Sequence, residues 1–285
     1  MKLNYVLLFL LLMLRSVSAS DTFYFTAIPD EDSSRLEERF SEVAKYLEKS
    51  LGVPVKYIPV KSYSASVTAF KNNRVQLAWF GGLSGVKARI AVPGSQAIAQ
   101  GEEDVSFKSY FIAHSSSGLL FSDEFPKELE GKTFLFGSKG STSGRLMPEF
   151  FFRRYMNDAP DQVCDRVGFS GDHSRTLALV QAGSYQVGAL NYAVWDSALK
   201  AGKIDASKVS VIWETPTYPD YNWTIRAGVD HVWGTGFSNK VKAALLGMSD
   251  EKLLKSFPRS KFISAQNQDY QPILDTAKKL GIIRE

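Results

Sequence analysis

Segments typical of strands alternate with segments typical of helices along most of this chain, and this alternation limits the fold more than any other feature. Residues 23–28 are rich in aromatic and β-branched side chains and are followed by Pro29-Asp30, as expected of a strand that ends in a turn. Residues 33–51 then repeat apolar side chains three or four positions apart, which predicts an amphipathic helix. The chain therefore begins with a β-α unit.

The same pattern continues toward the C-terminus. Further strands are predicted at 53–60, 75–80, 109–114, 133–136, 187–190 and 209–213. Further helices are predicted at 63–72, 147–157, 174–182, 240–246 and 273–280. Such alternation favours an α/β fold of doubly wound sheets with helices on both faces. Ligands of these sheets bind beyond the carboxyl ends of the strands, so the loops after strands are the candidate sites.

Length and composition suggest two packed domains. The chain has 285 residues, 44% of them hydrophobic, which is enough to bury a core and excludes a disordered chain. At roughly 150 residues per domain, this length predicts about two domains. The only cysteine, Cys164, excludes an intramolecular disulfide, so stability must come from packing.

The first 19 residues have the pattern of a secretion signal peptide. Lys2 is basic, residues 6–14 are apolar, and Val17-Ser18-Ala19 ends in the small residues that signal peptidase cuts. A membrane anchor is the alternative, but the apolar run is shorter than the roughly 20 residues that cross a bilayer, and Arg15 interrupts it. No cysteine follows that could be lipidated. We therefore expect a periplasmic or secreted protein, cleaved near Ala19 and not membrane-spanning.

Charge and histidine spacing argue against several classes of partner. The formal net charge is +4, and loss of Lys2 and Arg15 with the leader leaves +2, which is too small for a nucleic-acid-binding surface. The histidines His114, His173 and His231 lie far apart without the spacing of metal ligands. No dinucleotide-binding fingerprint occurs. We expect no metal, no cofactor and no nucleic acid.

The most informative loop is 137–144, with the sequence GSKGSTSG, directly after the strand 133–136. Its glycines let backbone N–H groups turn toward a ligand, and the hydroxyls of Ser141, Thr142 and Ser143 can donate hydrogen bonds. The positive end of the following helix points at the same loop. A nucleotide P-loop is excluded because its lysine and glycine spacing is absent. A helix N-cap is the simpler alternative, but it needs only one hydroxyl. The loop predicts an anion site.

A second polar cluster, 168–176, also opens a helix. His173 can donate to an oxyanion and Arg175 can supply charge, although a capping or packing histidine fits His173 equally well. Ser170 beside His173 raises the alternative of a hydrolase. The nucleophile motif Gly-x-Ser-x-Gly fails, however, because Asp172 stands in place of its last glycine. We therefore expect a binding protein and not an enzyme.

Three segments together resemble the phosphonate-, phosphite- and phosphate-binding family of periplasmic proteins. They are 75–84 (VQLAWFGGLS), 140–148 (GSTSGRLMP) and 171–173 (GDH), in the same order and spacing as in that family. Within it, the chain looks most similar to a branch labelled selenate-binding. The resemblance implies a two-lobed type II periplasmic-binding fold that closes on a tetrahedral anion as the solute-binding subunit of an ABC importer. A monomer working with a permease and an ATPase is the expected arrangement. The alternatives are a sensor subunit for a membrane receptor, or a hydrolase on the same scaffold.

The resemblance also implies which residues touch the ligand. The family's Ser-Thr-Ser loop falls on residues 141–143, its histidine on His173, and a tyrosine at a helix start on Tyr63. The family's ligand-binding tyrosine is replaced by Phe80, which loses a hydrogen bond. Of two carboxylates that hold the amine of aminoalkylphosphonates, one is replaced by Asn191. For the other, Asp220 is the candidate substitute.

The residues also limit the chemistry of the ligand. Hydroxyls and backbone amides can hold a buried anion without a formal cation, and Arg145 and Arg175 fit surface positions better than the site. An acid such as Asp220 favours a ligand oxygen that carries a proton, because only a protonated oxygen donates to a carboxylate. Because the family's two amine-binding carboxylates lack clear equivalents here, the resemblance implies that aminoalkylphosphonates are disfavoured relative to a bare oxyanion. Phosphate, phosphite, phosphonate, sulfate, selenate and selenite stay open.

The fold that the resemblance implies also gives the lobe boundaries. Lobe one is expected to combine residues 20–113 with 214–285, and lobe two to be residues 114–213. The chain would cross between lobes near 112–116 and return near 214–216. Two linking segments of this kind form a hinge, and closure around the ligand is the expected motion.

Overall fold

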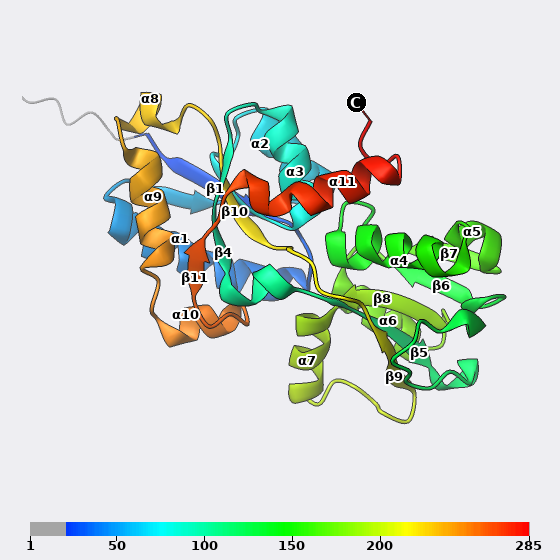
Figure 1. Cartoon of the computed structure of the whole chain (residues 1–285). Helices are drawn as coiled ribbons and strands as arrows, with labels where there is room; N and C mark the ends of the chain where they lie inside the picture. Colours follow the sequence, from blue (N-terminus) through cyan, green and yellow to red (C-terminus); the bar gives the residue numbers. More distant parts are fainter. Residues whose placement is uncertain (1–20, 285) are drawn as a thin grey trace, which may run out of the picture.

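Two separate mixed β-sheets organise residues 21–284, the part of the chain that this computed structural model describes (Figure 1). The expected leader and its cleavage site near Ala19 lie outside these residues. Helices flank both sheets, so the predicted two-lobed α/β architecture is confirmed. Within the described part of the chain, no helix combines the length and the apolar character that a membrane span requires.

The first sheet forms lobe one and has the strand order β11-β4-β10-β3-β1-β2. Its central strands β1 and β3 are parallel and almost fully buried, which explains their nearly continuous apolar sequence. β10 enters from the far end of the chain and pairs antiparallel with both β3 and β4. The strands are β1 (Phe23–Ala27), β2 (Val55–Tyr57), β3 (Leu77–Phe80), β4 (Gln96–Gly101), β10 (Asn222–Ile225) and β11 (Phe262–Ser264).

The second sheet forms lobe two and has the order β7-β6-β8-β5-β9. β6 runs parallel to β7 and β8, whereas β5 is antiparallel to both of its neighbours. The carboxyl ends of β6, β7 and β8 therefore lie on one edge of the sheet. The strands are β5 (Ser109–His114), β6 (Thr133–Phe136), β7 (Arg166–Phe169), β8 (Val187–Asn191) and β9 (Val209–Glu214).

Helix boundaries follow from local capping. The carboxylate of Asp32 accepts the N–H groups of Ser34 and Arg35 at the start of α1, and Gly52, with φ of 69°, ends that helix. In lobe one the helices are α1 (Ser33–Leu51), α2 (Tyr63–Lys71), α3 (Gly82–Ala91), η1 (Glu102–Ser106), α8 (Val229–Trp233), α9 (Phe237–Leu246), α10 (Glu251–Ser256), η5 (Asn267–Tyr270) and α11 (Gln271–Lys279). In lobe two they are η2 (Ser115–Ser117), η3 (Lys127–Leu129), η4 (Thr142–Leu146), α4 (Met147–Met156), α5 (Pro160–Val163), α6 (His173–Gln181) and α7 (Tyr192–Lys200).

The first lobe crossing lies earlier than expected. The predicted boundary at 113 and crossing at 112–116 fall at the end of β5 and just beyond it, and β5 pairs with β8 and β9 of lobe two. The chain instead crosses between the end of β4 at Gly101 and the start of β5. An alternating apolar strand looks the same in either sheet, so the sequence did not reveal which one β5 joins. The return crossing runs from the end of β9 to the start of β10, through residues 215–221.

The two crossing segments pair with each other. Phe107 and Tyr218 exchange two backbone hydrogen bonds of 2.9 Å, and the N–H of Asp220 donates to the carbonyl of Asp104 (3.0 Å). The buried carboxylate of Asp104 in turn accepts from Nε (2.8 Å) and Nη2 (2.6 Å) of Arg259, on the segment before β11. This bidentate ion pair fastens the hinge to lobe one.

We predict that Asp104→Asn lowers the free energy of unfolding by about 3–5 kcal/mol, because it leaves the buried Arg259 guanidinium without its counter-charge. Urea unfolding of the ligand-free protein measures this. The matched control is Glu251→Gln, which removes the exposed ion pair with Lys255 and should leave stability unchanged. Equal effects of the two substitutions would contradict a role of the buried pair in the hinge.

Candidate oxyanion site

The loop between β6 and α4 forms a tight turn that lets other side chains lie close to its backbone. The N–H of Gly137 donates to the carbonyl of Gly144 (2.8 Å), and the N–H of Leu146 donates to the carbonyl of Ser141 (3.0 Å), which makes η4 a π-helical turn. A Cβ atom at Gly144 would lie 2.9 Å from Cε1 of His173. Glycine at this position therefore lets His173 lie against the loop.

The three hydroxyls of this loop have different roles. Ser141 accepts the N–H of Gly144 (2.9 Å) and so caps the helix. Thr142 accepts the N–H of Leu83 (3.0 Å) at the start of α3, which joins lobe two to lobe one. The hydroxyl of Ser143 is buried and has no partner within hydrogen-bond geometry. Of the three, Ser143 is the one whose hydroxyl makes no hydrogen bond of normal geometry to a described residue, and it lies beside the carboxyl of Asp220.

His173, the first residue of α6, is completely buried. Burial lowers the pKa of its imidazole to about 4, so the ring is neutral at pH 7. Its Nδ1 accepts the backbone N–H of Asn191 (3.3 Å), so the proton resides on Nε2. Nε2 has no partner among the described residues. His173 therefore presents a neutral N–H donor.

Asp220 stands on the return crossing, where its side chain is 1% exposed. Burial raises the pKa of this carboxyl to about 7, although hydrogen bonds from Thr142 and Gly82 act in the opposite direction and lower it. One oxygen accepts the backbone N–H of Gly82 (2.8 Å), and the other has no partner. Near neutral pH the carboxyl can thus accept or donate a proton.

Tyr63, at the start of α2, supplies a third donor. Its side chain is 2% exposed and packs against the loop, since a Cβ atom at Gly140 would lie 2.9 Å from Cβ of Tyr63. Burial raises the pKa of the phenol well above its ordinary value, and the neighbouring Asp30 adds to this. The hydroxyl stays protonated, lies near the hydroxyl of Ser141, and makes no hydrogen bond of normal geometry to a described residue.

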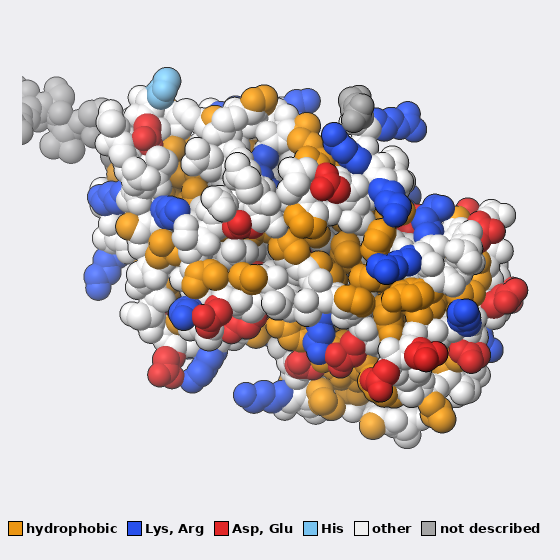
Figure 2. Space-filling view, viewed as in Figure 1, with side chains coloured by type: hydrophobic (Ala, Val, Ile, Leu, Met, Phe, Trp, Pro, Cys, Tyr) orange, Lys and Arg blue, Asp and Glu red, His pale blue; other side chains and the backbone are white. Residues whose placement is uncertain are grey.

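Four buried polar atoms without hydrogen-bond partners therefore gather where the lobes meet. Tyr63 and His173 both pack on the glycines of the 137–144 loop, and Asp220 interacts with the hydroxyls of Thr142 and Ser143. In the space-filling view of Figure 2, the two lobes touch on the face that is shown. Buried polar groups are ordinarily paired, so such a cluster is the signature of a ligand site. Three neutral donors and one titratable carboxyl suit a small oxyanion.

The other predicted site residues lie close by without offering a free polar group. Both polar atoms of the Asn191 amide already make a hydrogen bond, since Nδ2 donates to the Tyr221 hydroxyl (3.1 Å) and Oδ1 accepts the N–H of Ala193 (2.7 Å). Phe80, at the end of β3, packs edge-on against Phe70 with ring centroids 5.7 Å apart. Arg145 pairs with Glu149.

Sequence reasoning missed Asp30, which follows β1. Its Oδ2 accepts from the Tyr221 hydroxyl (2.7 Å), while Oδ1 has no partner. Burial, followed by the charge of Glu31, raises the pKa of this carboxyl to about 6. The Pro29-Asp30 turn lies just after a central parallel strand, which is the position that should have marked Asp30 as a candidate.

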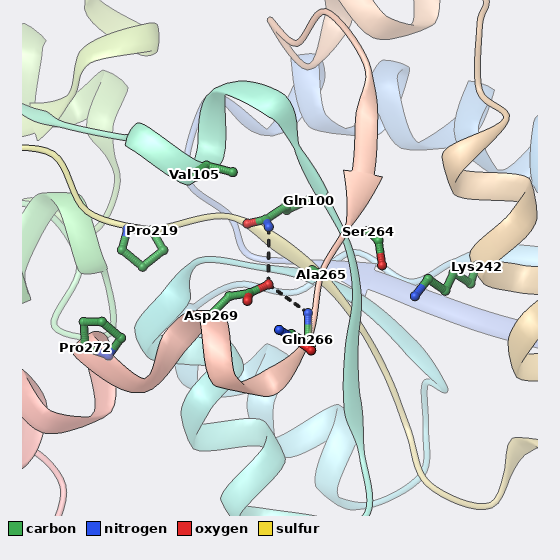
Figure 3. A pocket seen from close by; sticks show the side chains of 9 residues that line it. All are labelled: Gln100, Val105, Pro219, Lys242, Ser264, Ala265, Gln266, Asp269 and Pro272. Atoms are coloured by element: carbon green, nitrogen blue, oxygen red, sulfur yellow. Dashed lines mark hydrogen bonds between the residues drawn. The ribbon is translucent and has the colours of Figure 1, made fainter.

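A groove on the outside of the hinge is separate from this cluster. It has a volume of about 680 Å³ and lies between the crossing segments and the start of α11 (Figure 3). Its carboxylate, Asp269, already accepts from the N–H of Gln266 (3.0 Å) and from Gln100 (3.5 Å). No group of three or more His, Cys, Asp or Glu residues within 21–284 is placed to hold a metal. The oxyanion cluster is thus the candidate site.

The raised pKa of Asp220 predicts a pH-dependent stability. The folded protein keeps this proton up to about pH 7, whereas the unfolded chain loses it near 3.8, so the stabilisation is full below pH 4 and is lost as the pH rises through 7. Asp220→Asn removes this titration. The free energy of unfolding of the variant minus that of the wild type should rise by about 2 kcal/mol between pH 5 and pH 7. A difference that stays constant in urea unfolding would contradict the assignment.

Comparisons with known proteins identify the family of this chain. The profile of the family described as "ABC transporter, phosphonate, periplasmic substrate-binding protein" matches residues 25–270. The Probable ABC transporter phosphite binding protein PhnD1 of Prochlorococcus marinus is 39% identical over 265 residues, which is 90% of this chain and 89% of that protein. The structure of PhnD1 in complex with methylphosphonate has a TM-score of 0.88 at 38% identity and covers 92% of this chain and 99% of that chain.

A second solved structure shares the fold at lower identity. The binding protein component of an ABC phosphonate transporter from Pseudomonas aeruginosa has a TM-score of 0.79 at 20% identity, over 90% of this chain and 85% of that chain. The family match spans most of the chain. The chain therefore belongs to the family of phosphonate periplasmic substrate-binding proteins of ABC transporters, whose members are binding components and not enzymes.

Proposed function

We propose that this protein captures phosphite or methylphosphonate between Tyr63, Ser143, His173 and Asp220, and delivers it to the permease and ATPase of an importer. The observation behind the proposal is that three neutral donors and one carboxyl oxygen, all buried and unpaired, gather at one place between the lobes. The leader pattern predicts cleavage near Ala19 and export from the cytoplasm. Outside the cytoplasm the protein would work as a monomer.

The carboxyl of Asp220 favours a phosphorus oxyanion. A fully deprotonated dianion beside a carboxylate would be repelled, so one proton must be shared between them. Phosphorus oxyanions exchange a proton near neutral pH, as the second pKa of about 6 of phosphate esters shows. Because the pKa of Asp220 is about 7, either partner can hold that proton. Sulfate and selenate bring no proton, so for these anions Asp220 must supply it alone.

Two residues narrow the choice further. Phe80 stands where the family's tyrosine offers a hydroxyl to the ligand, so this chain has one donor fewer at that position. Asn191 replaces a carboxylate, and both polar atoms of its amide already make hydrogen bonds, so an amine has no acidic partner there. This second change disfavours an aminoalkylphosphonate. The name of PhnD1 favours phosphite or methylphosphonate, since that protein is described as phosphite-binding and its structure holds methylphosphonate.

Calorimetry with methylphosphonate, phosphite, phosphate, 2-aminoethylphosphonate, sulfate and selenate tests the proposal. We expect methylphosphonate or phosphite to bind with a dissociation constant of about 1 μM or lower, at least tenfold tighter than phosphate, which corresponds to about 1.4 kcal/mol. Selenate as the tightest ligand would instead support the selenate-binding branch. Binding of none of the six below about 1 mM would overturn the capture function.

The loop hydroxyls provide a second, finer test. Ser143→Ala should weaken binding by about 1.5–3 kcal/mol, because a donor to a charged oxygen is lost, and should leave stability unchanged. Ser141→Ala should instead lower stability by about 1 kcal/mol through the lost helix cap. Ligand titration and urea unfolding of both variants measure the two effects. The reverse pattern would show that Ser143 is structural and that Ser141 holds the ligand.

A further inference from the structure

Four residues join the lobes in a closed circuit of hydrogen bonds beside the candidate oxyanion site. The Tyr221 hydroxyl donates to Oδ2 of Asp30 (2.7 Å) and accepts from Nδ2 of Asn191 (3.1 Å). The backbone N–H of Asn191 donates to Nδ1 of His173 (3.3 Å). The backbone N–H of His173 then donates to the carbonyl of Asp30 (2.9 Å). The circuit thus runs from lobe one through the return crossing to lobe two and back.

We propose that Tyr221 is a positioning residue that latches the closed lobes and fixes His173 with its Nε2 toward the ligand. This proposal rests on the proposed function only in the choice of the ligand. Its own bonds join protein groups, so it acts in the same way for any oxyanion that closes the clamp.

The ring of Tyr221 is held by lobe one. It stacks on Trp79 with centroids 5.4 Å apart and an interplanar angle of 25°, and its side chain is 2% exposed. Such a ring cannot follow lobe two when the lobes separate. A phenol hydroxyl has one proton to donate and lone pairs that accept, and here it does both at once. One of these bonds, from Asn191, crosses between the lobes.

Opening of the lobes must break this crossing bond. Asn191 ends β8 and caps α7, so it moves with lobe two, and the Asp30 carbonyl would also lose the N–H of His173. The circuit is therefore complete only in the closed state. Because it is buried there, the loss of any one of its bonds would leave a buried polar group without a partner. Its contribution should appear in the rate at which the clamp reopens, because interactions formed after docking slow dissociation.

The same circuit sets the orientation of the imidazole. The backbone N–H of Asn191 donates to Nδ1 of the ring, and the Asn191 side chain donates to the Tyr221 hydroxyl. Because Nδ1 accepts this bond, the ring proton stays on Nε2, which has no partner among the described residues. Loss of the Tyr221 hydroxyl frees the Asn191 side chain and loosens this support.

Tyr221→Phe removes the hydroxyl but keeps the ring that stacks on Trp79, so the fold is retained. We expect the affinity for methylphosphonate to fall about tenfold or more, nearly all of it as faster dissociation in stopped-flow fluorescence. The matched control is Tyr46→Phe, whose hydroxyl donates to the carbonyl of Ala244 within lobe one (2.6 Å). This control should leave both rate constants unchanged.

Closure itself is measured with one spin label on each lobe, at Lys56→Cys and Lys200→Cys in a Cys164→Ala background. Saturating methylphosphonate should give a single short distance in the otherwise unchanged protein. In Tyr221→Phe we expect a second, longer distance at the same ligand occupancy. A second variant, Asp30→Ala, removes the acceptor of the Tyr221 hydroxyl, which is the next bond of the circuit. Because Tyr221→Phe already breaks that bond, the double variant should lose little more affinity than the stronger single variant.

The results for Tyr221→Phe and for the double variant decide whether the latch exists. Unchanged dissociation and unchanged distances in Tyr221→Phe overturn the latch. Additive losses in the double variant overturn it too, and assign the hydroxyl to direct contact with the ligand. If methylphosphonate fails to bind the unsubstituted protein, the proposed ligand is wrong. In that case the spin-label distances are compared without ligand. The unsubstituted protein should show a population at the short, closed distance that Tyr221→Phe lacks. Equal distance distributions in the two proteins would overturn the latch.

Discussion

A small anion removed from water must be surrounded by hydrogen-bond donors, and neither lobe of this protein has enough of them alone. Tyr63 and Asp220 come from lobe one and the return crossing, whereas Ser143 and His173 come from lobe two. An incompletely paired charge costs far more than a single hydrogen bond returns. In the proposed site, binding and closure would therefore be one event, because its residues come from both sheets and meet where the lobes join.

The hinge and the site are built from the same stretch of chain. Asp220 donates its N–H to the carbonyl of Asp104, and Asp104 is held by the buried guanidinium of Arg259. A shift of the crossing segment would move the carboxyl of Asp220 and the neighbouring hydroxyl of Tyr221 together. The rigid part of the hinge thus fixes two groups at the site, while the loops of lobe two approach them.

The sequence predicted the alternating α/β architecture and the loop at 137–144, because both depend on local patterns. It could not divide the roles of Ser141, Thr142 and Ser143, since capping, lobe bridging and ligand donation all need a hydroxyl. It also placed the first crossing too late, because an apolar strand such as β5 fits either sheet. Asp30 follows the central strand β1, which marks its position, but its partner Tyr221 lies 191 positions away, so no local pattern shows which group it contacts.

The choice of neutral donors over a cation explains how such a clamp can be both selective and reversible. Arg145 is near the loop, yet it pairs with Glu149 and lies over the rings of Phe136 and Phe169, so its charge is already used. A free guanidinium would attract every oxyanion alike. In the proposed site, hydroxyls, a neutral imidazole and a carboxyl with a pKa of about 7 would instead require the correct number of oxygens and protons. Selection then depends on geometry and protonation, and release needs no strong ion pair to be broken.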